Sequence, residues 1–235
     1  MKPKYRVIAE LIQQKIVQDY YHEMEKLPTE DEFIEEYGVS RTTIRKALDM
    51  LVQNGLIIPR QGSGFFIRKI AKEGFINLEI FKGLSADVAS TDIQTKVIDF
   101  QKMVADEHLA QEMKCEIGTP LYFVKRLRCI NQRKSIIEYS YFNKNLIPYL
   151  NEEIISNSIY QYIQCELNLE IHYVDRIIEA RYLTDDEATL LNLPPLAPAL
   201  ISTNYATLKN GQIFDYSIDV YHYQNIKFLK LSNFH

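Results

Sequence analysis

Signals for the end of one helix and the start of the next lie two residues apart, at Gly38 and Ser40. They constrain the fold more than any other feature of the chain. Thr29 followed by Glu32 forms a capping box, in which each side chain bonds the other residue's backbone N–H at a helix start. Gly38 can adopt the left-handed conformation that ends a helix, and Ser40 is a favoured N-cap for the next helix. The segment therefore predicts two helices joined by a short turn.

The second of these helices should have two different faces. Its apolar residues recur at helical spacing and predict a buried stripe of Ile44, Ala47, Leu48 and Leu51. Arg41, Thr42 and Arg45 point the other way near the helix start, and Gly55 ends the helix. A helix with such polar residues at its N-terminus suits the major groove of DNA. Arginine there can pair with guanine O6 and N7, and threonine can contact a phosphate or a thymine methyl.

A short hairpin, or wing, is expected directly after this helix. Its strands are 56–58 and 65–68, and a basic, glycine-containing loop lies between them. Glycine lets the backbone approach a groove without obstruction by a side chain, and Arg60 adds positive charge. We therefore expect contacts with DNA at Thr29, Glu30, Ser40, Arg41, Thr42, Thr43, Arg45, Arg60, Gln61, Gly62, Ser63 and Gly64.

The formal net charge of −4 does not oppose this interpretation, because the charges are segregated along the chain. Acidic residues crowd the segment before Gly38, whereas Asp49 is the only acidic residue between Arg41 and Lys69. The basic face should steer this part of the chain toward phosphates. Because one copy carries few basic groups, we expect a homodimer on a palindromic, double-stranded operator.

These motifs resemble the winged helix-turn-helix domain of GntR-family bacterial transcription regulators. The resemblance rests on segments 27–33, 39–48 and 60–64, and the sequence departs from the usual wing at Ser63, where lysine is common, and at Phe65, where threonine is common. It implies a DNA-binding domain over residues 1–68. We expect a linker at 69–75 and an effector-binding and dimerisation domain over 76–235.

The composition argues against several other classes of protein. No 18-residue apolar run is present, so no membrane span is expected. No apolar segment follows the first residues, which argues against a signal peptide. Cys115, Cys129 and Cys165 are widely spaced and indicate reduced thiols, not disulfides or a metal site. We expect a cytoplasmic protein, associated with the nucleoid when bound to its operator, with no metal and no cofactor.

The rest of the chain predicts an α+β domain with a mostly antiparallel sheet and helices packed on it. Asn210–Gly211 is a strong signal for a hairpin turn, and a second hairpin is expected across the four residues 131–134. The expected strands are 76–81, 95–104, 120–130, 135–143, 171–182, 199–208 and 212–223. The expected helices are 5–18 in the first domain and 106–113, 158–167 and 184–191 in the second.

A candidate anion site lies in this second domain. Arg126 and Arg128 alternate along a strand, so their side chains leave the same face about 7 Å apart. Two guanidinium groups so placed suit a phosphate or a carboxylate, although a solvated basic face is an alternative. Ser158 and Tyr160 lie at a helix start, where backbone N–H groups also favour an anion.

Acceptors for sugar hydroxyls are expected on the last long strand. Asp215, Ser217, Asp219 and Tyr221 share one face of it, opposite an apolar face of Phe214, Tyr216, Ile218 and Val220. Glu138 could join this site, depending on the strand register. A four-residue turn places Glu138 on the face opposite the arginines, whereas a turn of three or five residues places it beside them.

This second domain resembles the UTRA effector domain, a chorismate-lyase-like module of the HutC subfamily. The resembling segments are 122–128, 138–141, 158–163 and 214–221. The resemblance implies that Arg126, Arg128, Ser158 and Tyr160 hold an anionic effector, often a sugar phosphate, while Glu138, Asp215 and Tyr221 line the rest of the pocket. It also implies a contact from Ser85. A ligand-responsive repressor is thus expected, and a chorismate-lyase-like enzyme with an autoregulatory DNA-binding domain is the alternative.

Overall fold

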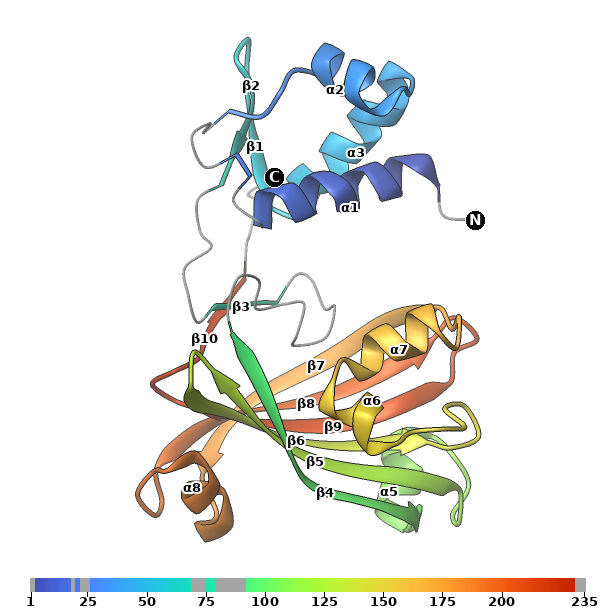
Figure 1. The fold of residues 1–235 in the computed structure, drawn as a ribbon, viewed down its shortest axis with the longest axis vertical. Helices are drawn as coiled ribbons and strands as arrows, with labels where there is room; N and C mark the ends of the chain where they lie inside the picture. Colours follow the sequence, from blue (N-terminus) through green and yellow to red (C-terminus); the bar gives the residue numbers. More distant parts are fainter. Residues whose placement is uncertain (1–2, 18–19, 22–25, 69–74, 79–91, 231–235) are drawn as a thin grey trace. The chain divides into compact units, whose positions relative to one another are not determined.

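The computed structural model describes residues 3–17, 20–21, 26–68, 75–78 and 92–230. The chain divides into two compact units (Figure 1). We call residues 1–81, 86–90 and 228–235 the head unit, and residues 82–85 and 91–227 the sheet unit. The boundaries expected at 68, 75 and 76 stay a prediction.

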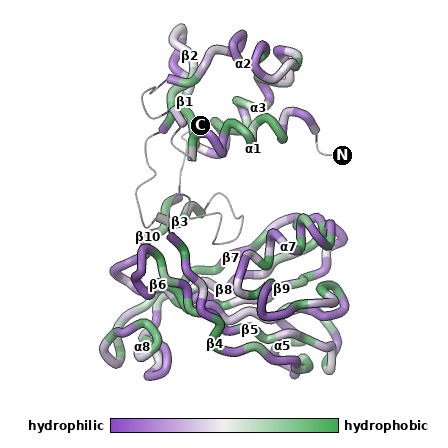
Figure 2. Tube along the Cα trace, in the orientation of Figure 1, coloured by the Kyte–Doolittle hydropathy of each residue, from purple (hydrophilic) through white to green (hydrophobic). Residues whose placement is uncertain are grey.

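The head unit is a helical core followed by a hairpin. Helices α1, α2 and α3 and strands β1 and β2 pack around one cluster of buried side chains that includes Ile12, Phe33 and Leu48. The tube in Figure 2 is accordingly hydrophobic along parts of α1 and α3. The wing strands lie one or two residues from their expected bounds. The elements are α1 Lys4–Val17, α2 Glu30–Tyr37, α3 Arg41–Gln53, β1 Ile57–Arg60 and β2 Gly64–Ile67.

The caps expected from the sequence are confirmed. Thr29 and Glu32 form a reciprocal capping box, and Gly38 ends α2 with φ +61°. The Ser40 hydroxyl accepts from the Thr43 N–H at the start of α3. The four apolar residues of the expected stripe on α3 are fully buried. Local sequence signals therefore position the whole helix-turn-helix.

Two short strands form a separate small sheet. β3 (Phe75–Asn77) pairs with β10 (Lys227–Leu229), and the Leu78 N–H donates to the Leu229 carbonyl at 2.8 Å. Strand β10 was not expected from the sequence. Strand β3 begins the expected strand 76–81, whose end lies outside the described residues.

The sheet unit is built on one six-stranded sheet, in which every neighbouring pair of strands is antiparallel. The spatial order is β4-β5-β6-β9-β8-β7, so β4 and β7 are its two edges (Figure 1). This confirms the expected fold class. The strands are β4 Ile93–Val104, β5 Pro120–Ile130, β6 Arg133–Asn143, β7 Ile171–Tyr182, β8 Pro198–Leu208 and β9 Ile213–His222.

Helices cover both faces of this sheet (Figure 1). On one face α6 and α7 pack against Tyr122, Phe142 and Phe214. On the other face α5 and α8 pack against two further buried clusters. Helix α6 was missed because it spans little more than one turn. The helices are α5 Glu107–Met113, α6 Glu152–Ser156, α7 Ile159–Cys165 and α8 Asp185–Leu191.

The expected face of Phe214 is wrong. Phe214 packs with Phe142 and α7, on the same side of the sheet as Asp215. The cause is a β-bulge, because the β8–β9 register shifts between Ala206 and Thr207. A bulge inserts one extra residue and so breaks the strict alternation of side chains.

Candidate functional site

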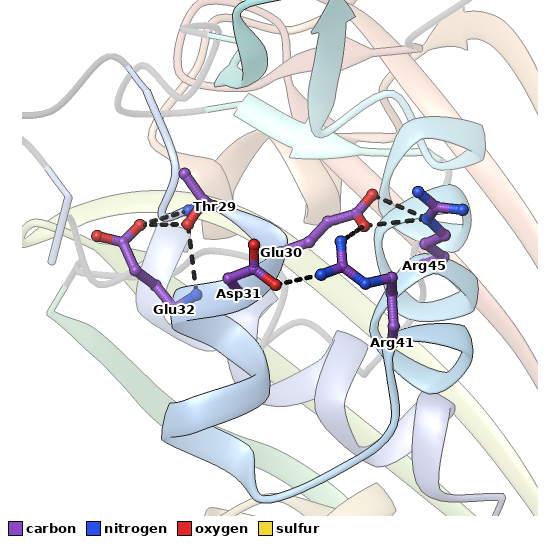
Figure 3. A network of polar contacts seen from close by, with 6 residues as sticks. All are labelled: Thr29, Glu30, Asp31, Glu32, Arg41 and Arg45. Carbon is purple, nitrogen blue, oxygen red and sulfur yellow. Dashed lines mark hydrogen bonds and ion pairs between the residues drawn. The ribbon is translucent and has the colours of Figure 1, made fainter.

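The N-terminal end of α3 carries a network of exposed ion pairs with α2. Arg45 Nε lies 3.1 Å and 3.0 Å from the two carboxylate oxygens of Glu30. Arg41 Nη1 donates to Glu30 at 3.3 Å, and Arg41 also pairs with Asp31 (Figure 3). The arginine side chains remain more than half exposed, at 51% and 61%. Glu30 therefore orients two guanidinium groups that stay accessible to a ligand.

Three of the hydroxyl groups expected to contact DNA make hydrogen bonds within the protein. Thr29 bonds with Glu32 in the capping box, and the Ser40 and Thr43 hydroxyls lie 2.9 Å apart. Thr42 is exposed beside them. The sequence could not separate the two roles, because a residue that caps a helix start also lies where the helix would meet a groove.

The tip of the wing is exposed from Arg60 to Gly64. Gly62 and Gly64 have φ values of +71° and +95°, which glycine adopts without strain. The Arg60 guanidinium lies 4.2 Å from the centre of the Phe66 ring. A Cβ atom added at Gly64 would lie 3.2 Å from Lys26 Cε.

Lys26 is a basic residue at the wing that the sequence analysis missed. The backbone of Lys26 forms an isolated antiparallel β-bridge with Phe66. The next residue, Leu27, donates its N–H to the Phe65 carbonyl at 2.8 Å. Lys26 therefore places a positive charge beside Gly64 of the wing. No spacing rule could reveal it, because Lys26 reaches the wing through contacts distant in sequence.

Neutralising Glu30 should change how the head unit binds DNA. In Glu30→Gln, both arginines lose an anionic partner, and a negative charge disappears from their surroundings. We expect severalfold tighter binding to a duplex of arbitrary sequence and a smaller preference for a duplex selected from a random library, since phosphate attraction does not depend on sequence. Fluorescence anisotropy with both duplexes measures this. Unchanged binding to both would contradict a positioning role, and Glu170→Gln in the sheet unit is the control.

The sheet unit holds a second cluster of charged residues, and this one is buried. Arg126, Arg128 and Glu138 are 5%, 3% and 7% exposed, so the alternative of a solvated basic face is wrong. Arg128 Nε donates to Glu138 Oε2 at 2.8 Å. Arg126 Nε lies 2.9 Å from the same oxygen, but its N–H makes no hydrogen bond to a described residue.

Glu138 lies beside the arginines because of an unexpected register. The turn has only two residues, Asn131 and Gln132, with φ values of +48° and +63°. A two-residue turn alone would still leave Glu138 on the wrong face. A bulge at Ser135 adds one residue, and Glu138 then pairs directly with Arg126. The expected four-residue turn is therefore wrong.

Arg126 also ties the sheet to the segment before α7. Its Nη1 donates to the carbonyl groups of Ile155 and Asn157, at 2.9 Å and 3.3 Å. The next residue, Ser158, caps α7 by accepting from the Gln161 N–H. The Tyr160 hydroxyl then donates to Asp215 Oδ2 at 2.8 Å. The structure thus joins Arg126 to the residue before Ser158 and Tyr160 to Asp215, and a role of these residues in binding an effector stays a prediction.

A polar network extends this cluster across β8 and β9. The Tyr221 hydroxyl and Asn204 Nδ2 both donate to Asp219 Oδ2, at 3.1 Å and 2.9 Å. Arg176 Nε donates to Asn204 Oδ1 at 2.9 Å. Neither Asn204 nor Arg176 is among the site residues expected from the sequence. Ser202 and Asn204 lie two positions apart on one face of β8, and this spacing was the available signal.

Burial sets the protonation of the carboxyl groups in this network. It raises the pKa of Asp215 to about 8, and Oδ1 of Asp215 has no hydrogen-bond partner among the described residues. Burial likewise raises the pKa of Asp219 to about 6. It would also raise the pKa of Glu138, but Arg126 and Arg128 lower it below its ordinary value. The site therefore offers an ionised Glu138 and a protonated Asp215 near neutral pH.

The contribution of Asp215 to stability should accordingly fall as the pH rises. The pKa of Asp215 is raised on folding, so its contribution is fully present below the unfolded pKa of 3.8 and is lost as the pH rises toward 8. We expect Asp215→Asn to gain stability relative to the natural protein with increasing pH, by up to about 1.4 kcal/mol per pH unit. Urea unfolding between pH 5 and 8 measures the difference. Asp175→Asn, at an exposed position, should show no such trend, and a flat difference for Asp215→Asn would contradict the burial argument.

One expected site residue cannot be placed. Ser85, with the turn at 83–85, lies outside the described residues. Within the described ranges, none of the helices combines the length and apolar character needed to cross a membrane.

The two units together define a class of protein: a winged helix-turn-helix regulator that carries a separate α+β domain. Family models match both parts. The model for bacterial regulatory proteins of the gntR family matches residues 4–67, and the UTRA domain model matches residues 89–227. The chain belongs to the GntR family of transcription regulators and carries a UTRA domain.

Individual relatives agree with this assignment. The HTH-type transcriptional regulator YydK of Bacillus subtilis is 34% identical over 98% of both chains. Its crystal structure superposes with a TM-score of 0.80, covering 99% of this chain and 100% of that one. The repressor MngR of Escherichia coli, named for a mannosyl-D-glycerate transport/metabolism system, is 30% identical over 97% of this chain and 95% of its own length.

The expected HutC-like character is also supported. The histidine utilization repressor of Klebsiella aerogenes is 25% identical over 85% of this chain and 82% of its own length. These relatives are transcription regulators, and the chain is a regulator and not an enzyme. The alternative of a chorismate-lyase-like enzyme is therefore set aside.

Proposed function

We propose that this regulator is a repressor that binds a palindromic operator as a homodimer and responds to an anionic small molecule, most simply a sugar phosphate. The head unit contacts double-stranded DNA through α3, the start of α2 and the wing. The sheet unit binds the effector at the buried charged cluster. The effector favours one arrangement of the heads and so changes the affinity for DNA.

The observation that carries the effector proposal is the charged cluster itself. Burying two arginines is costly, and here they share one carboxylate, that of Glu138. The Arg126 Nε–H and Asp215 Oδ1 lack hydrogen-bond partners in the described structure. A ligand with an anionic group and a hydroxyl group would supply both partners. Phosphate oxygens suit guanidinium groups because the geometry permits paired hydrogen bonds.

The relatives support repression and a sugar-derived signal. MngR and the histidine utilization repressor are both named as repressors. Mannosyl-D-glycerate, in the name of MngR, is a sugar derivative that carries a carboxylate. Dimerisation rests on the small number of basic groups at the wing and α3, since a palindromic operator doubles the phosphate contacts.

A thermal-shift titration tests the effector proposal. Phosphorylated sugars and the matching free sugars are added to the purified chain. A ligand at one hundred times its Kd should stabilise the protein by about 2.7 kcal/mol. We expect stabilisation by one or more sugar phosphates, none by the free sugars, and none in Arg126→Ala.

Two further variants make this test sharp. Tyr160→Phe keeps the aromatic packing but removes the hydroxyl that bonds Asp215, and it should weaken binding while the protein stays folded. Arg181→Ala removes an arginine that pairs with Glu187, outside the cluster, and it should leave the shift unchanged. If no sugar phosphate stabilises the chain, or if Arg126→Ala keeps the full shift, the effector proposal is wrong.

A further inference from the structure

The buried charged cluster is one end of a longer belt of polar side chains that crosses the sheet. Residues paired directly across strands lie on the same face, and so do residues two positions apart on one strand. Two neighbouring rows are polar throughout, and we call them together the polar belt. The first row is Arg126, Glu138, Asp219 and Ser202, and the second is Ser140, Ser217, Asn204 and Arg176.

The polar belt is not the kind of surface that packs against helices. All of its residues are buried except Asp219 and Arg176, which are half-buried. The part of the same face under α7 is apolar, with Tyr122, Phe142 and Ala206 in the core. Burying polar groups is costly unless they have polar partners. The belt is therefore suited to a polar ligand that lies along it.

The polar belt is longer than a phosphorylated monosaccharide. It runs over β5, β6, β9, β8 and β7, which are spaced about 4.8 Å apart, so it extends roughly 19 Å. The arginines that suit a phosphate, Arg126 and Arg128, both lie on β5 at one end. A phosphate followed by one pyranose ring covers roughly two strand spacings and reaches about as far as β9. The end of the belt on β8 and β7 would stay uncovered.

This far end is the accessible part of the polar belt. Asp219 and Arg176 are half-buried there, and Ile178, which pairs with Ser202 at the end of the first row, is 37% exposed. Asp219 Oδ2 accepts from Asn204 and Tyr221, whereas no described residue donates a hydrogen bond to Asp219 Oδ1. A ligand hydroxyl could donate to this second oxygen.

The charges of the far end favour an uncharged group. The positive charge of Arg176 lies close enough to Asp219 to lower the pKa that burial raises, and the two charges offset each other near neutral pH. At the β5 end, in contrast, two arginines share the single carboxylate of Glu138. An anion is thus favoured at the β5 end only. Carboxylate, amide and hydroxyl groups at the far end suit the hydroxyls of a sugar.

We propose that the effector is a phosphorylated disaccharide, whose second ring binds at the far end of the polar belt, beside Asn204, Asp219 and Arg176. This inference rests on the proposed function and narrows its effector from sugar phosphates in general to those with two rings. The phosphate binds Arg126 and Arg128, the first ring lies over β6 and β9, and the second ring lies over β8 and β7.

Isothermal titration calorimetry of the full chain tests the second ring. The probes are the 6-phosphates of glucose, mannose and galactose. Each is matched by disaccharide phosphates that contain the same phosphorylated ring with a further hexose linked at its O1. We expect at least one disaccharide phosphate to bind roughly 10-fold or more tightly than its matched hexose phosphate, since the second ring adds two or three hydrogen bonds.

Two variants locate the second ring. Arg176→Ala and Asn204→Ala should each weaken binding of the disaccharide phosphate roughly 10-fold and binding of the matched hexose phosphate by a much smaller factor. Arg176 is half-buried, so its variant keeps the test sound if Asn204→Ala does not fold. Arg181→Ala, on the same strand but on the opposite face, is the control and should change neither affinity.

The outcomes separate this inference from the proposed function. If hexose phosphates bind as tightly as every matched disaccharide phosphate, the second ring has no site and only the inference is overturned. The inference is also overturned if Arg176→Ala weakens both classes of ligand alike, because the polar belt is then an internal network only. If no sugar phosphate of either class binds, the proposed effector and the inference fail together.

Discussion

Replacement of Glu138 by alanine is expected to lower the free energy of unfolding of the sheet unit by about 3–5 kcal/mol. Glu138 is the carboxylate within 2.9 Å of both Arg126 Nε and Arg128 Nε. Its removal leaves two buried guanidinium groups without that anion, and an uncompensated buried charge is costly. The loss should be seen in urea unfolding followed by circular dichroism.

The control is a carboxylate in an exposed ion pair. Glu170 lies 2.6 Å from Lys209, with both side chains about two-thirds exposed, at 67% and 70%, and Glu170→Ala should cost less than about 1 kcal/mol. Inorganic phosphate should restore part of the stability of Glu138→Ala, because it can occupy the space between the arginines. A loss below about 1 kcal/mol for Glu138→Ala would show that water screens the cluster.

The second large effect is expected at the start of α3. Arg45→Ala should weaken binding to a duplex selected from a random library by roughly 10- to 100-fold, since a bidentate arginine–guanine contact contributes about 1–3 kcal/mol. Binding to an arbitrary duplex should weaken much less. Fluorescence anisotropy at several salt concentrations distinguishes these cases.

The salt dependence gives a second criterion for Arg45. Removing a residue that contacts a base relaxes the sequence specificity of binding. Removing a residue that contacts a phosphate weakens binding to all sequences alike and lowers the salt slope by about 1. An equal loss of affinity for both duplexes would indicate that Arg45 contacts a phosphate and not a base. Lys209→Ala, in the sheet unit, is the matched loss of a basic residue and should change neither affinity. No effect of Arg45→Ala would remove the start of α3 from the interface.

Elements whose signals are local could be predicted before the fold was known. Thr29, Gly38 and Ser40 defined the boundaries of α2 and α3, because a cap depends on residues three or four positions apart. The buried stripe of α3 followed from helical spacing. The antiparallel class of the sheet followed from its hairpins, and the resemblance to known regulators came from these same short segments.

Which charged groups meet depends on how the strands and helices pack. One extra residue at Ser135 brings Glu138 to the arginines, and another bulge turns Phe214 to the side of α7. A bulge reverses the face of every residue beyond it, and its position depends on packing against other strands. The pairing of Glu30 with Arg45 likewise joins two helices. Local patterns specify elements, but contacts distant in sequence specify the sites, because they depend on how those elements pack.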